Sequence, residues 1–405
     1  METPAHPLSR KPGYRLALAG CVLAVLVVGL GAFTRLVDAG LGCPDWPGCY
    51  GHILWPEHAH EIAAANAAFP HAPVETHKTW PEQVHRLFAS SLGLVVLGLF
   101  FVALRHRDRR LPVASMLALL AVLIVATVGR VVKGDVLDPY LLVIVATYFL
   151  NLLRLWWLQP APSAQPLRLP ALLAGAVILQ GLFGMWTVTL KLWPQVVTGH
   201  LLGGFTILSL LWLLSLRLGN RPWRVDAGLL VRLRALRPWV FGGLVIVVVQ
   251  IALGGWMTSN YADVACPDLP RCQARWWPPM DFAQGFNVFQ EVGPNYLGGQ
   301  LDNAARVAIH MAHRIGALVT SAYLIFLALR FYALGAPFAR RAASGLLAVL
   351  ILQVCLGLSN VLFRFPVDVA VAHNLGGALL LLSLVTLCHR VVTAGPSEEL
   401  SHEEH

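Results

Sequence analysis

The chain has 405 residues, of which 57% are hydrophobic and only 13% are charged, and its mean hydropathy is +0.65. Soluble globular proteins carry about twice that fraction of charged residues, so the composition excludes an ordinary soluble enzyme. We predict an all-α polytopic membrane protein. The formal net charge of +9 follows from the side of the membrane on which Lys and Arg lie, and we expect no nucleic-acid partner.

Ten apolar stretches are each long enough to cross a bilayer as a helix, which takes about 20 residues. An even number of crossings places both termini on one side. Most Lys and Arg residues then lie in cytoplasmic segments and most Asp and Glu residues lie outside, which is the positive-inside pattern. The first stretch is not followed by a small-residue cleavage site, so we expect it to stay in the protein. The predicted helices lie at roughly 16–34, 84–104, 112–132, 137–158, 171–191, 195–216, 238–258, 308–330, 342–362 and 368–390.

Two long loops on the outer side contain the same cysteine motif. Residues 31–49 read GAFTRLVDAGLGCPDWPGC and residues 254–272 read GGWMTSNYADVACPDLPRC. A structural disulfide in each loop is favoured, because the outer side is an oxidising space where disulfides persist. A redox-active pair lacks the tight C-x-x-C spacing, and a zinc site lacks further ligands at matching positions in both loops. The four cysteines are Cys43, Cys49, Cys266 and Cys272.

The similarity between the two halves continues at four histidines. VHRLFASSLG around His85 matches AHRIGALVTS around His313, and TGHLLGGF around His200 matches VAHNLGGALL around His373. Both copies begin on the cytoplasmic side. We therefore predict two parallel, pseudo-symmetric four-helix bundles related by an axis along the membrane normal.

The first copy contains an insertion. The separation between equivalent positions falls from 228 residues at the first histidine to 173 at the second. A helical hairpin at about 112–158 accounts for the difference. We expect the two halves to comprise residues 1–222 and 223–395, followed by a polar, disordered tail at 396–405.

The four histidines indicate a bound cofactor. Ionisable residues inside a membrane are costly and are usually functional. Two imidazoles that face each other in the core of a four-helix bundle can provide both axial ligands of a haem iron. A lone histidine of this kind would be explained better by hydrogen bonding between packed helices, but four at duplicated positions favour haem.

One arginine directly follows the first histidine of each copy. Arg86 and Arg314 are natural partners for haem propionates, because a guanidinium binds a carboxylate through two parallel hydrogen bonds. The alternative for each is a side chain that extends to the outer membrane surface.

Glu82 breaks the symmetry between the copies. It lies three residues before His85 and on the same helix face, whereas the equivalent residue of the second copy is His310. A carboxylate beside only one cofactor could act as a general base or stabilise developing positive charge. A solvated carboxylate at a helix start is an equally good interpretation. A carboxylate-bridged di-iron site is disfavoured, because it needs the E-x-x-H motif on two helices.

These features together resemble the haem A synthase family, membrane enzymes that convert haem O to haem A for terminal oxidases. The matching segments run from the first predicted helix to the last, and the inserted hairpin departs from the eight-helix plan typical of the family. The segments are TRLVDAGLGCPDWPGC, PEQVHR, LQGLFGMWTVTLKLWPQVVTGHLLGG, CPDLPRC, AHR, LQVCLG and AHNLGG.

The resemblance implies that a methyl group of haem O is oxidised stepwise, through an alcohol, to a formyl group. It implies that His85 and His200 face this substrate, with Glu82 as the catalytic carboxylate. His313 and His373 would then hold a permanent haem b, and each cysteine pair would form a disulfide within its loop.

The resemblance therefore assigns catalysis to residues 1–222 and haem b to residues 223–395. The topology, together with a short N-terminus that is neither Arg-rich nor Ser-rich like a transit peptide, predicts a bacterial inner-membrane protein with both termini in the cytoplasm. Candidate partners besides haem O and membrane lipid are haem O synthase, terminal-oxidase assembly factors, an unidentified electron partner and a second copy of the chain. Two other functions stay open: a di-haem b electron-transfer protein without catalysis, and a membrane disulfide oxidoreductase that uses the loop cysteines.

Overall fold

The computed structural model describes residues 10–105, Leu150 and residues 168–397. Within these ranges the regular secondary structure is almost entirely helical, and eight helices are long and apolar enough to cross a membrane. This confirms the prediction of an all-α polytopic membrane protein. The two further helices expected within 112–158 lie outside the described residues.

The eight long helices correspond to the eight predicted crossings that fall within the described ranges. Proline occupies an early position in several of them, where its missing N–H costs no helical hydrogen bond. The helices are α1 (Tyr14–Leu36), α3 (Thr76–Arg105), α6 (Arg168–Thr189), α7 (Pro194–Gly219), α9 (Arg237–Ser259), α11 (Asn303–Tyr332), α12 (Pro337–Leu362) and α13 (Val367–Thr393).

Helices α3 and α11 begin earlier than the apolar pattern predicted. Hydropathy marks only the part of a helix that lies in hydrocarbon. The helical hydrogen bonding of α3 and α11 continues outward through the polar segments that precede His85 and His313. These first turns therefore stand in the layer of the outer loops.

Short elements lie at both ends of the molecule. Helix α2 (Ala59–Ala68) belongs to the first outer loop and α10 (Phe282–Gly285) to the second. At the opposite end, β1 (Arg224–Val225) precedes α8 (Ala227–Ala235) and pairs in parallel with β2 (Gly395–Pro396).

The strand pairing corrects the predicted start of the disordered tail. Pro396 is part of β2, and the backbone N–H of Ser397 donates to the carbonyl of Val225 at 2.8 Å. The ordered chain thus extends past the expected boundary at residue 396, because the end of the chain finds backbone partners beside α8. Residues 398–405 lie outside the described ranges.

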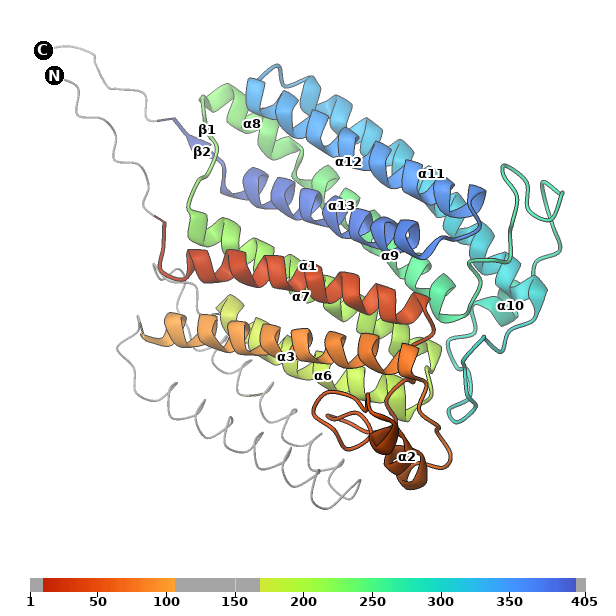
Figure 1. Ribbon diagram of the computed structural model, residues 1–405. Helices are drawn as coiled ribbons and strands as arrows, with labels where there is room; N and C mark the ends of the chain where they lie inside the picture. Colours follow the sequence, from red (N-terminus) through yellow and green to blue (C-terminus); the bar gives the residue numbers. More distant parts are fainter. Residues whose placement is uncertain (1–9, 106–149, 151–167, 398–405) are drawn as a thin grey trace, which may run out of the picture.

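The long helices pack in two sets of four (Figure 1). The first set contains α1, α3, α6 and α7, and the second contains α9, α11, α12 and α13. In the first set, α3 and α7 each pack against both α1 and α6, so α3 and α7 are diagonal to each other. Helices α11 and α13 are diagonal in the same way, because each packs against α9 and α12.

The two sets share one apolar interface. It is formed by contacts of α13 with α1 and α7 and of α7 with α9. There, Leu375 of α13 lies against Gly29 of α1, and Leu201 of α7 lies against Gly255 of α9. The indole N–H of Trp212 donates to the hydroxyl of Thr386 at 2.7 Å across the interface.

Equivalent residues of the two copies contact each other at the outer ends of α1 and α9. Arg35 corresponds to Thr258, and its guanidinium donates to the Thr258 carbonyl at 2.6 Å. Asp38 corresponds to Tyr261, and the Tyr261 hydroxyl donates to the Asp38 carboxylate at 2.9 Å. A residue can touch its own counterpart only near the axis that relates the copies, so the pseudo-symmetry axis passes through this junction.

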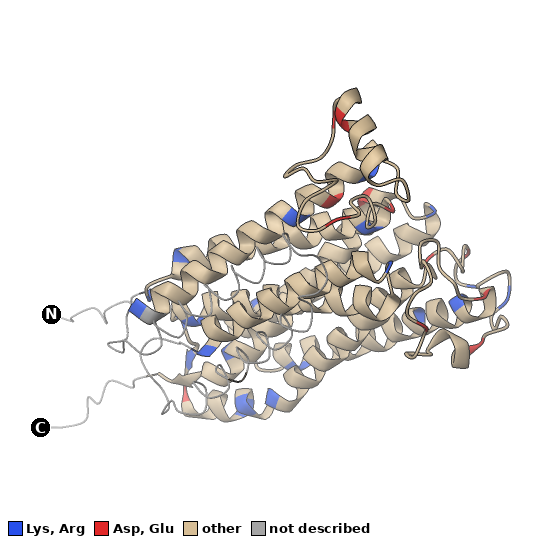
Figure 2. Ribbon diagram, turned by 90° about the horizontal axis from the view of Figure 1, so that it is seen from below, with Lys and Arg blue, Asp and Glu red and all other residues tan. Residues whose placement is uncertain are grey.

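The second outer loop reaches across to the first set of helices. The indole N–H of Trp193, at the start of α7, donates to the Gln290 carbonyl at 3.2 Å, and the Tyr296 N–H donates to the Lys191 carbonyl at 3.0 Å. Both outer loops lie at the end opposite the two ends of the described chain, and Asp and Glu gather at the loops, while many Lys and Arg lie at the other end (Figure 2).

We expect Gly42→Ala to destabilise the protein by about 1–3 kcal/mol, as overpacking usually does. A Cβ atom at Gly42 would overlap the carbonyl oxygen of Lys78 on α3, so the first loop must move. Thermal unfolding in detergent measures the effect. Gly181→Ala is the control, because a Cβ atom there meets nothing within 4 Å. Equal melting temperatures for the two variants would contradict this packing of the loop.

Candidate functional site

His85 and His200 meet across the centre of the first helix set. They project from the diagonal helices α3 and α7, and their ring centroids are 6.3 Å apart with the ring planes at 82°. Both residues are half-buried. Their Nδ1 atoms are buried and have no hydrogen-bond partner among the described residues. The expected pairing of these two histidines is therefore present.

A glycine of the neighbouring helix lies against each ring. A Cβ atom at Gly31 of α1 would come within 2.9 Å of Cε1 of His85, and one at Gly184 of α6 within 3.2 Å of Cε1 of His200. Such distances are too short for comfortable contact. Glycine is thus needed at both positions, and all four helices contribute to the arrangement.

The second helix set repeats this arrangement. A Cβ atom at Gly254 of α9 would lie 3.1 Å from Cε1 of His313, and one at Gly357 of α12 would lie 2.9 Å from Cε1 of His373. His313 and His373 belong to the diagonal helices α11 and α13. The molecule therefore contains two equivalent histidine pairs near its outer end.

These pairs fit a metal group held by two imidazoles. Metal–imidazole bonds are about 2 Å long, so the separation of His85 and His200 leaves room for one metal ion between the rings. A buried imidazole nitrogen without a partner is costly. His373 resembles His85 and His200 in this respect, since its buried Nδ1 has no partner within the described part of the chain. We call each histidine ring with the glycine packed against it a histidine cradle. The imidazole donors and these cradles fit haem with two histidine ligands.

Glu82 is buried beneath the first outer loop. Only 5% of the residue is exposed, and its carboxylate accepts hydrogen bonds from the Cys43 backbone N–H at 3.0 Å and from the guanidinium of Arg86. The alternative of a solvated carboxylate is therefore wrong. Burial of this carboxylate is tolerated because a cation and a backbone N–H compensate for lost water.

His310, the counterpart of Glu82, is also buried and is 2% exposed. Its Nδ1 lies 2.9 Å from the carbonyl oxygen of Ala262, to which it donates. The two residues thus fasten equivalent helices to equivalent loops, but only the first copy places an acidic group there.

Arg86 and Arg314 hold the cysteine loops in the same way. Each guanidinium donates to three backbone carbonyls at equivalent positions of its loop, at distances of 2.6–3.4 Å. The carbonyls belong to Cys43, Asp45 and Gly48 for Arg86, and to Cys266, Asp268 and Arg271 for Arg314. The propionate role predicted for the two arginines stays a prediction.

Both cysteine loops are closed by disulfides. Cys43 pairs with Cys49 and Cys266 with Cys272, as expected, so these four thiols are not available to bind zinc. No group of three or more metal-ligating side chains occurs among the residues that the structure describes.

An aspartate that follows the first cysteine by two residues braces each loop. The side chain of Asp45 accepts from the N–H groups of Tyr50 and Gly51, and that of Asp268 accepts from those of Gln273 and Ala274. This explains why the C-P-D motif is present in both copies.

Sequence reasoning missed the four glycines that contact the histidine rings. Gly31 and Gly254 stand first in the two matching segments that contain the cysteine motif. Gly184 and Gly357 occur in the segments LQGLFG and LQVCLG, and both lie sixteen residues before the second histidine of their copy. That shared spacing marks the two positions but not their contact with the rings.

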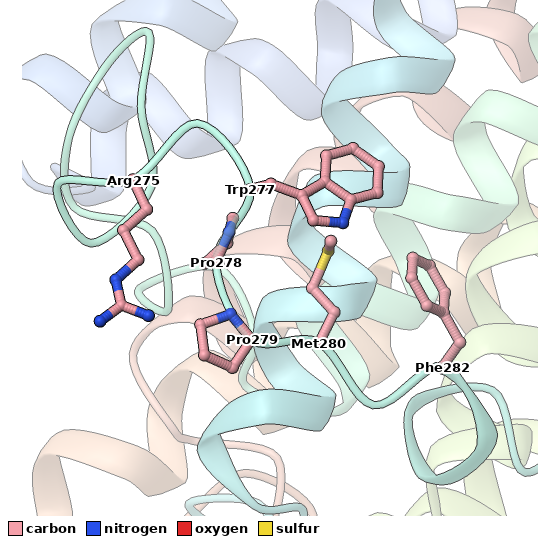
Figure 3. A pocket seen from close by; sticks show the side chains of 6 residues that line it. All are labelled: Arg275, Trp277, Pro278, Pro279, Met280 and Phe282. Atoms are coloured by element: carbon pink, nitrogen blue, oxygen red, sulfur yellow. The ribbon is translucent and has the colours of Figure 1, made fainter.

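An open hollow on the described surface lies away from the histidines. It has a volume of about 510 Å³ and belongs to the second outer loop (Figure 3). Aromatic and proline side chains dominate its lining, with no pair of groups suited to acid–base chemistry. The lining residues are Arg275, Trp277, Pro278, Pro279, Met280 and Phe282.

Comparison with known proteins agrees with this geometry. The COX15-CtaA family model, described as a cytochrome oxidase assembly protein, matches residues 14–133 and 140–385. The heme A synthase of Shewanella oneidensis is 40% identical over 366 residues, which cover 90% of this chain and 92% of that protein. The heme A synthase of Sphingopyxis alaskensis is 26% identical and covers 99% of this chain and 98% of its own length. A match along nearly all of the two repeats shows that the chain belongs to the COX15-CtaA family of cytochrome oxidase assembly proteins.

Proposed function

We propose that this protein is a haem A synthase, a membrane oxidoreductase that converts a methyl group of haem O to a formyl group. The relatives named heme A synthase support the enzyme class. The observation that carries the proposal is the pair of equivalent histidine cradles, of which only one has a buried carboxylate beside it. Haem A is a cofactor of terminal oxidases, which agrees with the family description.

The substrate is assigned to the N-terminal half, residues 1–222. His85 and His200 would face haem O, and Glu82 lies one helical turn before His85. Oxidation of a methyl group releases protons, and a buried carboxylate can accept one or stabilise positive charge that develops nearby. The Cys43 N–H and Arg86 hold Glu82 in place for this task.

A permanent haem b is assigned to the C-terminal half, residues 223–395. His313 and His373 would be its ligands, and the group would supply one-electron transfer between the reacting half and an external partner. The junction of Arg35 with Thr258 fixes the outer ends of the two halves relative to each other.

Arg86 and Arg314 are proposed to bind propionates in addition to the loops. The Nε atom of Arg314 is buried and has no hydrogen-bond partner among the described residues. One donor of this guanidinium thus remains for a carboxylate of haem b.

We propose a bacterial inner-membrane location with both termini in the cytoplasm. The two ends of the described chain lie at the same end of the molecule, where basic side chains collect (Figure 2). The disulfide loops at the other end would then face an oxidising space. A second copy of the chain, haem O synthase and terminal-oxidase assembly factors are the proposed partners.

Glu82→Gln should reduce haem A formation by about 10²–10⁴-fold, the usual contribution of a positioned proton-transfer group. Glutamine preserves the size of the side chain and an acceptor for the Cys43 N–H but removes the charge. Extraction and chromatography of haems from cells supplied with haem O measure the effect. Glu57→Gln, at an exposed carboxylate of the same loop, should leave haem A formation intact. Normal haem A formation by the Glu82 variant would show that Glu82 is not the catalytic carboxylate.

Gly357→Ala should lower the haem b content of the purified protein. The added methyl group would press against the ring of His373 and displace it from its position. Gly345→Ala, on the same helix, has nothing within 4 Å of the added carbon and should retain haem b. Pyridine haemochrome spectra measure the haem-to-protein ratio of each variant. Full occupancy in the Gly357 variant would show that this cradle does not hold the cofactor.

A further inference from the structure

Glutamines of neighbouring helices hold two of the four histidines by their backbone. The amide nitrogen of Gln180 on α6 donates to the carbonyl of His200 at 2.6 Å. The amide nitrogen of Gln250 on α9 donates to the carbonyl of His313 at 3.0 Å and lies 3.1 Å from its Nδ1. Each glutamine thus fixes the helical turn that carries its histidine.

A third glutamine lies beside the third histidine. The amide nitrogen of Gln353 on α12 lies 3.5 Å from Nε2 of His373. All three amides also share a second contact. The amide oxygen packs so closely against the glycine three residues after the histidine that a Cβ atom there would overlap it. The glycines are Gly203, Gly316 and Gly376.

The glutamine and the glycine against which it packs form a clamp beside each of these three histidines. His85 has neither residue. Gln250 lies four residues before Gly254, and the residue four before Gly31 is Val27. The position of the following glycine is taken by Phe88, which is 38% exposed. A valine side chain offers no hydrogen bond, and Phe88 has a bulky side chain where the other three positions have glycine.

Two departures from the repeat therefore coincide around one histidine. The first copy gains the buried carboxylate of Glu82 one turn before His85 and loses the amide that holds the other three histidines. The rest of the cradle, including Gly31 beneath the ring, is unchanged. His85 thus lacks the side-chain amide that contacts each of the other three histidines, and it lies one helical turn after the acidic residue.

We propose that His85 is an exchangeable ligand of the substrate iron, and that Gln180, Gln250 and Gln353 are positioning residues that keep the other three histidines bound. This inference rests on the proposed haem ligation. In the exchange, the bond between iron and the imidazole of His85 breaks and a bond to a small neutral ligand forms, with no change in oxidation state. The position that His85 would vacate would lie one helical turn from Glu82.

Carbon monoxide tests the exchange in the purified protein loaded with both haems and reduced with dithionite. We expect CO to shift the spectrum of one haem of the two. His85→Ala should make this binding faster, because no imidazole has to leave first. Inert behaviour of both haems in the unmodified protein, or acceleration by His200→Ala and not by His85→Ala, would overturn the proposal.

A reciprocal pair of variants tests the glutamine clamp. Gln250→Val should allow CO to shift the spectrum of haem b as well, because the loss of one hydrogen bond weakens the hold on His313 by about tenfold. Val27→Gln combined with Phe88→Gly should slow CO binding at the substrate haem by a similar factor. If haem b stays unreactive toward CO in Gln250→Val, the proposed role of the glutamines is contradicted, even if the double variant does not fold.

The haem content separates this inference from the proposed function. If His85→Ala and His200→Ala both leave haem stoichiometry and spectra unchanged, the substrate site itself is misassigned and both proposals fail. If these variants alter the spectra but CO does not bind to the unmodified protein, only the ligand exchange is contradicted.

Discussion

The close approach of an imidazole ring to a glycine of the adjacent helix is the contact on which the rest of the structure depends. It occurs four times, once for each functional histidine. Each contact requires two helix backbones to lie near each other at one level. Two such contacts on opposite sides of a four-helix set bring diagonal histidines together at its centre. The repeat therefore produces two similar sites at the same end of the molecule.

The scaffold is symmetric, but the groups around the histidines are not. The arginines, the disulfides and the braced C-P-D turns make the same contacts in both copies, so they serve the loops. The differences collect around His85, where a buried carboxylate replaces His310 and apolar residues replace an amide clamp. A duplicated cofactor site can acquire catalysis in this way while its twin keeps a fixed ligand set.

Much of the fold was predictable because hydropathy and internal repetition report on single helices. The eight described crossings, the equivalent histidines and the disulfides follow from such local patterns. The contacts of Arg86 with loop carbonyls and the burial of Glu82 did not, because both depend on how the first loop folds back over α3. The role of Gly184 was equally hidden, since it requires knowing that α6 lies beside the ring of His200.

The most direct test of two distinct haem sites is the absorption spectrum and haem content of purified single histidine variants. The account predicts a b-type spectrum that is lost in His313→Ala and His373→Ala. The same resident haem should be retained in His85→Ala and His200→Ala. A protein that binds no haem, or one whose resident haem depends on His85 and not on His313, would contradict the account.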